Sequence, residues 1–211
     1  MDRTTHGISR RCFLRHTGSA LAAVTLLDLG AVGLSGCAAT EGAKTDAQPS
    51  ETAGLSWKTT LVGTDEPGEP LVVSGRIFAP DGRTPAAGAV LYVYHTDARG
   101  LYSEKDGQGG PPDPRIKGRM KADADGRYEF RTIKPASYPG SRNPAHVHAQ
   151  VSGGGFPEQW IHEFWFEGDP FLSADVLRRF DGLGAFSPVM SIKRGADGVL
   201  RGVRDVKLER G

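Results

Sequence analysis

The sequence predicts an all-β protein, an antiparallel β-sandwich with long loops and at most one or two short helices. Glycine and proline account for 29 and 14 of its 211 residues, well above the usual share of about 12% for the pair. Short runs of β-branched and aromatic residues alternate with these turn-forming residues. The sequence shows neither an internal repeat nor a sustained 3.6-residue hydrophobic period. The pattern therefore favours short strands joined by frequent loops over a helical bundle.

Six segments have the composition of strands. Residues 127–133 alternate between polar and apolar side chains, whereas 89–94 are apolar and aromatic throughout, as in a buried strand. A short helix is expected to follow Ser173, whose hydroxyl suits the N-cap position, and to run to Arg179. The predicted strands are residues 71–78, 89–94, 127–133, 145–151, 162–166 and 198–208, and the predicted Asp-Gly turns are 79–82 and 123–126.

The first 36 residues are expected to be an export signal. Adjacent Arg10 and Arg11 precede an apolar stretch at 21–34, the order found in twin-arginine signals. That stretch is too short and too interrupted to span a membrane, which takes about 20 apolar residues. It ends in Leu-Ser-Gly-Cys, which resembles a bacterial lipobox, so we expect a lipid anchor at Cys37 on the periplasmic or outer face of the cell envelope. The alternatives are a plain signal cleaved near Ala38 and an unrelated basic N-terminus.

Composition limits what the rest of the chain does. Residues 37–54 have the composition of a flexible tether, and 55–211 form one domain. The formal net charge is +1 and stays near zero without the signal, so no nucleic-acid partner is expected. Cys12 would leave with the signal and Cys37 would carry lipid, which excludes thiol catalysis and cysteine-ligated metals. An oligomer remains open.

Two histidines and two tyrosines are the candidate metal ligands. His146 and His148 are two residues apart in a predicted strand, so both side chains point to one face. Tyr102 follows the strand at 89–94, and Tyr138 precedes the histidine pair. A phenol has a pKa of about 10, and a hard, highly charged cation such as Fe³⁺ favours the tyrosinate form. An exposed strand also produces such a histidine pair by chance, and a tyrosine is commonly a half-buried sandwich residue.

Several ordered blocks around these residues resemble the intradiol ring-cleavage dioxygenases, in particular the catalytic domain of the protocatechuate 3,4-dioxygenase type. The resemblance covers about Leu71 to Leu172, which is most of the domain. The order and spacing of the blocks are far more specific than any one of them. The blocks are residues 88–94, 98–102, 125–135, 138–139, 144–148 and 166–170.

The resemblance implies a domain that binds Fe³⁺ through Tyr102, Tyr138, His146 and His148. Tyr138 would be the ligand, opposite His148, that an incoming catecholate displaces, and it would accept a catechol proton. The implied reaction opens a catechol-type ring between its two hydroxyls with O₂ and gives a muconate-type diacid. The implied enzyme is thus an oxidoreductase that incorporates both atoms of O₂.

Two further residues are expected in the catalytic site with Tyr138, and both depart from the family's pattern. The family has an Arg directly before the Pro-Ala-His block, where this chain has Asn143, with Arg142 one residue earlier. A loop either absorbs this shift or points the Arg142 guanidinium elsewhere. Glu163 stands where the protocatechuate type usually has Gln, and an anionic side chain in the pocket would disfavour a carboxylate-bearing substrate. We therefore expect a neutral or substituted catechol, unless Glu163 or its neighbour His162 is merely the solvent-facing residue of a strand.

A second hypothesis is a non-catalytic, exported β-sandwich binding module, transthyretin-like or carbohydrate-binding, with a vestigial metal site. Such a module has no need to keep two tyrosines and two histidines at the four ligand positions. The filled ligand set therefore favours the enzyme over the module.

Overall fold

The structure, a computed structural model, describes residues 54–104 and 114–210. The expected signal, the expected anchor at Cys37 and nearly all of the tether lie outside these residues, so export and lipid anchoring stay predictions. Within the described part, none of the helices combines the length and the apolar character that a membrane span requires.

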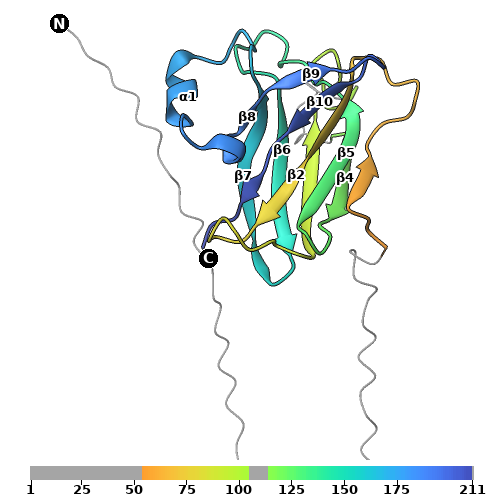
Figure 1. Cartoon of the computed structure of the whole chain (residues 1–211). Coiled ribbons are helices and arrows are strands. Elements are labelled where there is room, and N and C mark those ends of the chain that lie inside the picture. Colours follow the sequence, from red (N-terminus) through yellow and green to blue (C-terminus); the bar gives the residue numbers. More distant parts are fainter. Residues whose placement is uncertain (1–53, 105–113, 211) are drawn as a thin grey trace, which may run out of the picture. The chain divides into compact units, whose positions relative to one another are not determined.

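Two β-sheets pack face to face (Figure 1). The first sheet contains, in spatial order, β1 (Lys58–Thr60), β5 (Arg127–Ile133), β2 (Pro70–Phe78), β10 (Leu200–Val203) and β9 (Ile192–Arg194), with β11 (Val206–Lys207) also paired to β2. The second contains β4 (Ile116–Lys121), β3 (Ala89–His95), β6 (His146–Gly153), β7 (Phe156–Phe166) and β8 (Val189–Met190).

The predicted all-β sandwich is confirmed, and its sheets are mixed. The central pairs β2–β5, β3–β6 and β6–β7 are antiparallel, whereas β1–β5, β2–β10 and β7–β8 run parallel. The described chain contains one short α-helix, α1 (Ala174–Arg179), which lies beside β7 and β8 in Figure 1. It begins after Ser173, whose hydroxyl accepts a hydrogen bond from the Val176 N–H, as predicted. A single 3-10 turn, η1 (Gly184–Phe186), follows it.

Some strand boundaries differ from the prediction. β7 begins at Phe156 rather than at 162; its first half contains Pro157 and none of its residues is fully buried, so it lacks the signal of a buried strand. The segment predicted as one strand at 198–208 is β10 and β11, which keep the same register on β2 but are separated by Arg204 and Asp205. The short strands β1, β4, β8 and β9 escape prediction because six residues or fewer, several of them charged, show no clear alternation.

The inward faces of the two sheets form one hydrophobic core. On β6, Val147, Ala149 and Val151 are buried in this core. Because successive side chains of a strand point to opposite faces, His146 and His148 stand on the outer face of the second sheet. The alternation of β6 thus keeps both imidazoles out of the core.

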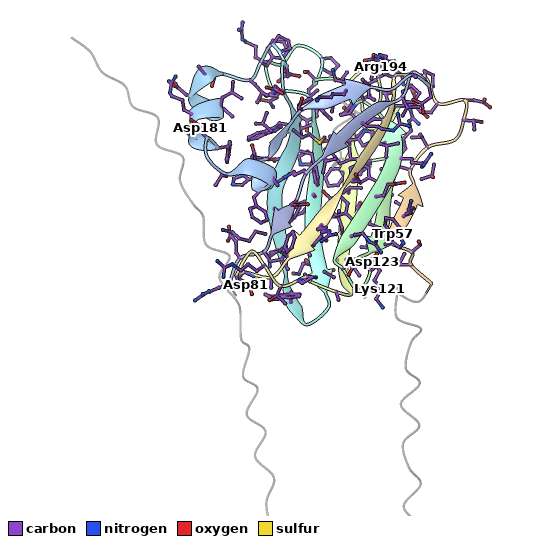
Figure 2. All side chains as sticks on the ribbon, in the orientation of Figure 1. Trp57, Asp81, Lys121, Asp123, Asp181 and Arg194 are labelled. Atoms are coloured by element: carbon purple, nitrogen blue, oxygen red, sulfur yellow. The ribbon has the colours of Figure 1, made fainter. Side chains whose placement is uncertain are left out.

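Short turns and long loops gather at opposite ends of the sandwich. Figure 2 shows Asp81 and Asp123, which belong to the two predicted Asp-Gly turns, at one end and Arg194 at the other. β3 ends at His95, which pairs with Val147 of β6, so the end of β3 lies beside the start of β6. The His95 ring also contacts the Thr132 hydroxyl, near the end of β5. The segments that follow β3 and β5, which carry the two tyrosines, therefore meet the start of the histidine strand.

The break between β10 and β11 is fixed by close contact with β2. The main-chain N–H of Arg204 donates to the Ser74 carbonyl at 2.9 Å, and its carbonyl accepts from the Tyr128 hydroxyl at 2.6 Å. That carbonyl lies so close to Gly75 that a Cβ there would stand 1.7 Å from the oxygen. Only glycine fits at this point of β2.

Replacing Gly75 with Ala should destabilise the fold, because the new methyl group must push the Arg204 carbonyl off Tyr128. Overpacking of this kind costs about 3 kcal/mol, to be measured by urea unfolding. Gly63→Ala is the matched control, since a Cβ at Gly63 meets nothing within 4 Å. Equal stability of the two variants would contradict the assigned role of Gly75.

Candidate metal centre

The four predicted ligands come together at one point. The Tyr102 hydroxyl lies 2.8 Å from Nε2 of His148, and the Tyr138 hydroxyl lies 3.0 Å from Nε2 of His146 and 3.2 Å from Nε2 of His148. The two Nε2 atoms are 3.0 Å apart, and the two tyrosine hydroxyls contact each other. Two oxygens and two nitrogens from three segments of the chain thus face a common centre.

The outer nitrogen of each imidazole has an acceptor nearby. Nδ1 of His146 lies 2.7 Å from the Pro144 carbonyl, which can only accept, so Nδ1 carries a proton and Nε2 is the nitrogen that faces the centre. Nδ1 of His148 lies 3.8 Å from Oε1 of Glu163. Burial, and then the neighbouring His146, lower the pKa of His148 to about 4, although Glu163 opposes the shift. His148 is therefore a neutral imidazole at neutral pH.

This donor set fits a metal ion. Donor atoms bound at about 2.0–2.1 Å and at right angles to one another stand about 3 Å apart, which is the spacing of the two Nε2 atoms. Among the described residues there is no cluster of three or more His, Cys, Asp or Glu side chains able to hold a metal. The two tyrosine oxygens complete the donor set with the two histidines, and phenolate donors suit a hard trivalent cation such as Fe³⁺.

Asp97 fixes the loop that carries Tyr102. Its carboxylate accepts from the main-chain N–H groups of Arg99 at 2.8 Å and Leu101 at 3.0 Å, and from the Arg99 guanidinium. Its main-chain carbonyl accepts from the Ala136 N–H at 3.1 Å, two residues before the second tyrosine. One buried residue thus joins the segments that hold Tyr102 and Tyr138.

Close packing of the main chain brings the two tyrosines together. Gly100 has a φ of 84°, and a Cβ there would stand 2.1 Å from the Ser137 carbonyl. Any other residue at Gly100 would push apart the segments that carry Tyr102 and Tyr138. The Tyr102 side chain is buried at 8% exposure, whereas Tyr138 is only partly buried. Tyr102 is therefore held more rigidly than Tyr138.

Two residues that sequence reasoning did not single out support the histidine strand. The Tyr94 ring stacks on the His148 ring, with centroids 4.6 Å apart and an 18° angle between the planes. The sequence places Tyr94 on the same face of its predicted strand as Tyr92, so alternation indicates an aromatic face on that strand. Asp169, in the Gly-Asp-Pro block, accepts from the Ala145 N–H at 3.0 Å and so holds the residue before His146.

The two other predicted catalytic residues, Glu163 and Arg142, have different neighbours. Glu163 faces His148, as given above, and its side chain is about one-third exposed. Arg142 is exposed, and its guanidinium carbon stands 5.8 Å from the centre of the Phe171 ring. Of the four described histidines, His95 is a core residue, held between the Thr96 carbonyl and the Thr132 hydroxyl at 2.6 Å each. The catalytic roles of Arg142 and Glu163 stay predictions.

Asp97→Asn should destabilise the protein most at neutral pH. Burial alone would raise the pKa of Asp97, but hydrogen bonds from Leu101 and Arg99 outweigh it and hold the pKa below its usual value. A depressed folded-state pKa stabilises the fold above the unfolded value of about 3.9, and this contribution is lost as the pH falls through the folded pKa. We expect the variant to lose about 2 kcal/mol at pH 7 and progressively less towards pH 3.

Thermal unfolding of both proteins between pH 3 and 7 measures this difference. Asp175→Asn is the control, because Asp175 is an exposed carboxylate on α1 that pairs with Arg178. Its loss should stay within about 0.5 kcal/mol at every pH. A deficit of Asp97→Asn that does not shrink on acidification would contradict the assigned role.

Comparison with known proteins identifies the family of this chain. The family model Dioxygenase_C, described as a dioxygenase, matches residues 50–181. Catechol 1,2-dioxygenase 1 of Acinetobacter lwoffii is 37% identical over 131 residues, which cover 54% of this chain and 41% of that protein. The protocatechuate 3,4-dioxygenase beta chain of Burkholderia cepacia is 37% identical over 118 residues, which cover 52% of this chain and 50% of that protein. The chain spans about half the length of these curated relatives.

Solved structures show the same fold. The dioxygenase domain of a dioxygenase–carbohydrate-binding protein fusion from Streptomyces sp. SirexAA-E aligns with a TM-score of 0.54 at 28% identity, over 72% of this chain and 88% of that one. Catechol 1,2-dioxygenase from Acinetobacter sp. ADP1 aligns with a TM-score of 0.58 at 24% identity, over 74% and 57% of the two chains. Since the family model covers more than half of the sequence, the chain belongs to the intradiol dioxygenase family.

Proposed function

We propose that this protein is an Fe³⁺-dependent intradiol dioxygenase that opens a catechol-type ring between its two hydroxyls with O₂ and yields a muconate-type diacid. The observation that carries the proposal is the convergence of two tyrosine oxygens and two histidine nitrogens on one centre. The relatives named above are dioxygenases of catechol and protocatechuate. We propose that it acts outside the cytoplasm, anchored by lipid at Cys37.

Tyr102, Tyr138, His146 and His148 would hold the iron. The two tyrosines, bound as tyrosinates, would offset two of its three positive charges, which suits a partly buried site. Bound Fe³⁺ supplies the Lewis acidity that holds a catecholate and passes its electron density towards O₂. The protein's part is to place the donors, to orient the ring and to accept protons from its hydroxyls.

The two tyrosines are suited to different parts. Tyr102 is buried in the loop fixed by Asp97, so it is the ligand that stays in place. Tyr138 is more exposed and lies in a loop with a glycine two residues later, Gly140, around which a Cβ would meet nothing within 4 Å. Tyr138 is therefore the ligand that would give way when a catechol hydroxyl arrives, and it would then take the proton of that hydroxyl.

Charge beside the centre selects the substrate. Glu163 places a carboxylate beside His148, whereas the guanidinium of Arg142 lies over the Phe171 ring. Two carboxylates about 4 Å apart near a protein surface repel each other by up to about 4 kcal/mol. A catechol without a carboxylate is therefore the substrate class that we propose.

The purified protein, expressed with ample iron, should show a burgundy tyrosinate-to-iron absorption band and consume O₂ with catechol. Tyr138→Phe should keep most of its iron through the remaining ligands but lose about 100-fold in turnover, because the proton acceptor is gone. Tyr102→Phe should lose iron itself. Iron analysis, absorption spectra and oxygen uptake distinguish these outcomes.

Tyr92→Phe is the control for both variants. Tyr92 is also a tyrosine on this sheet face, two residues before Tyr94, and it is not one of the four proposed ligands. A colourless, iron-free wild-type protein would contradict the enzyme and favour a binding module. Equal loss of iron and turnover in Tyr138→Phe would contradict its assignment as the displaced ligand.

The wild-type protein should turn over catechol and hydroxyquinol better than protocatechuate. Glu163→Gln should raise kcat/KM for protocatechuate relative to catechol by about tenfold, which corresponds to about 1.4 kcal/mol. Glu158→Gln, on the same strand, is the control, because Glu158 pairs with the Gln150 amide at 2.7 Å. A clear preference of the wild type for protocatechuate would contradict the proposed substrate class.

A further inference from the structure

β7 contains a bulge directly opposite His148. Ala149 pairs with Ile161 and Val147 pairs with Phe164, so one residue of β6 faces two residues of β7, His162 and Glu163. The extra residue lets Ile161 and Phe164, three positions apart, both pack towards the core. Bulges re-aim side chains and leave ladder groups unpaired. Here the bulge places Glu163 on the outer face beside His148.

Arg204, from the opposite sheet, holds this bulge. Its Nη1 donates to the His162 carbonyl at 2.8 Å and to the Glu163 carbonyl at 3.0 Å. The guanidinium lies over the Phe164 ring, 4.4 Å from its centroid. The main chain of Arg204 is itself fixed by β2 and Tyr128, as described above. The position of Glu163 is thus tied through one side chain to the first sheet.

Stability alone does not account for an arginine at this position. Arg204 is only 4% exposed, and its Nε has no hydrogen-bond partner among the described residues. Burial lowers the pKa of Arg204 to about 10, so the group remains charged at neutral pH. A buried charge that is incompletely satisfied is commonly no more stable than an apolar residue of similar volume. The contacts of Arg204 with the bulge therefore point to a role that methionine could not perform.

The site supplies such a role. Nε2 of His148 points at the proposed metal centre, so its proton must reside on Nδ1, and that N–H needs an acceptor. The structure places Oε1 of the Glu163 carboxylate 3.8 Å from Nδ1, within ion-pair range and longer than a direct hydrogen bond. Carboxylates behind histidine ligands fix the tautomer and raise the basicity of the ring, and losing one typically costs 10- to 100-fold in metal affinity.

We propose that Arg204 is a positioning residue that, by binding the two bulge carbonyls, holds the Glu163 carboxylate behind His148 and so fixes its Nε2 as a metal donor. This inference rests on the proposed function, since it assumes that His148 is a ligand. It assigns Glu163 to the support of the ligand as well as to the choice of substrate.

The test compares Arg204→Met, Arg204→Lys and Glu163→Gln with the wild type by competition for Fe³⁺ against a chelator. We expect Arg204→Met and Glu163→Gln each to lose about 10- to 100-fold in iron affinity. We expect the double variant to lose no more than Glu163→Gln alone, because Arg204 acts through Glu163. Arg204→Lys, which can still donate to the carbonyls, should recover most of the affinity. Arg201→Met, at an exposed arginine of β10 paired with Asp197, is the control and should bind as wild type.

A second readout needs no metal. Long-range ¹H–¹⁵N spectra of the iron-free protein report the His148 tautomer, which should be the Nδ1–H form in the wild type and mixed in Arg204→Met. If Arg204→Met fails to fold, Arg204→Lys and Glu163→Gln carry the same comparison. Wild-type iron affinity and an unchanged tautomer in the Arg204 variants, or additive losses in the double variant, would overturn this inference. A wild-type protein that binds no iron would instead overturn the proposed function.

Discussion

The two Nε2 atoms of His146 and His148 stand 3.0 Å apart, and this closeness sets the demands on the rest of the site. His148 is neutral at neutral pH, and two imidazole nitrogens this close favour a cation or hydroxyl protons between them. Strand β6 imposes the pairing, since alternate residues share a face. The tyrosine hydroxyls satisfy it within the chain, and a ferric ion would do so more strongly. The site is thus organised around positive charge before any ion is bound.

The two tyrosines need a different support because they lie in loops, where no ladder fixes the side chains. Asp97 and Gly100 provide it, the first through a buried carboxylate and the second by permitting contact with Ser137. Both act at the end of the sandwich where β3 and β5 stop. The short Asp-Gly turns at the opposite end leave this end free for the long connections. The distribution of turns therefore decides where the centre forms.

The sequence predicts the parts of the fold and site that depend on local periodicity. β5 has the predicted bounds, and the alternation of β6 places His146 and His148 on one face. That Tyr102 and Tyr138 join them follows from resemblance to the family, because no local pattern brings two loops together. The roles of Asp97 and Arg204 depend on contacts between residues about 40 positions apart. Such contacts leave no periodic signal, so only the structure shows them.

The break between β10 and β11 and the bulge in β7 are joined by Arg204, which lies in the break and donates to the bulge. In a continuous strand at 198–208, the carbonyl of residue 204 would belong to the ladder of the first sheet. The Arg204 carbonyl instead accepts from Tyr128, and its guanidinium donates to the main-chain carbonyls of the two bulge residues. Each irregularity removes hydrogen bonds from its own ladder, and each supplies partners for the other. Because the bulge faces His148, an irregular joint between the two sheets is coupled to the proposed metal ligand, and a change on the first sheet can alter the centre on the second without touching it.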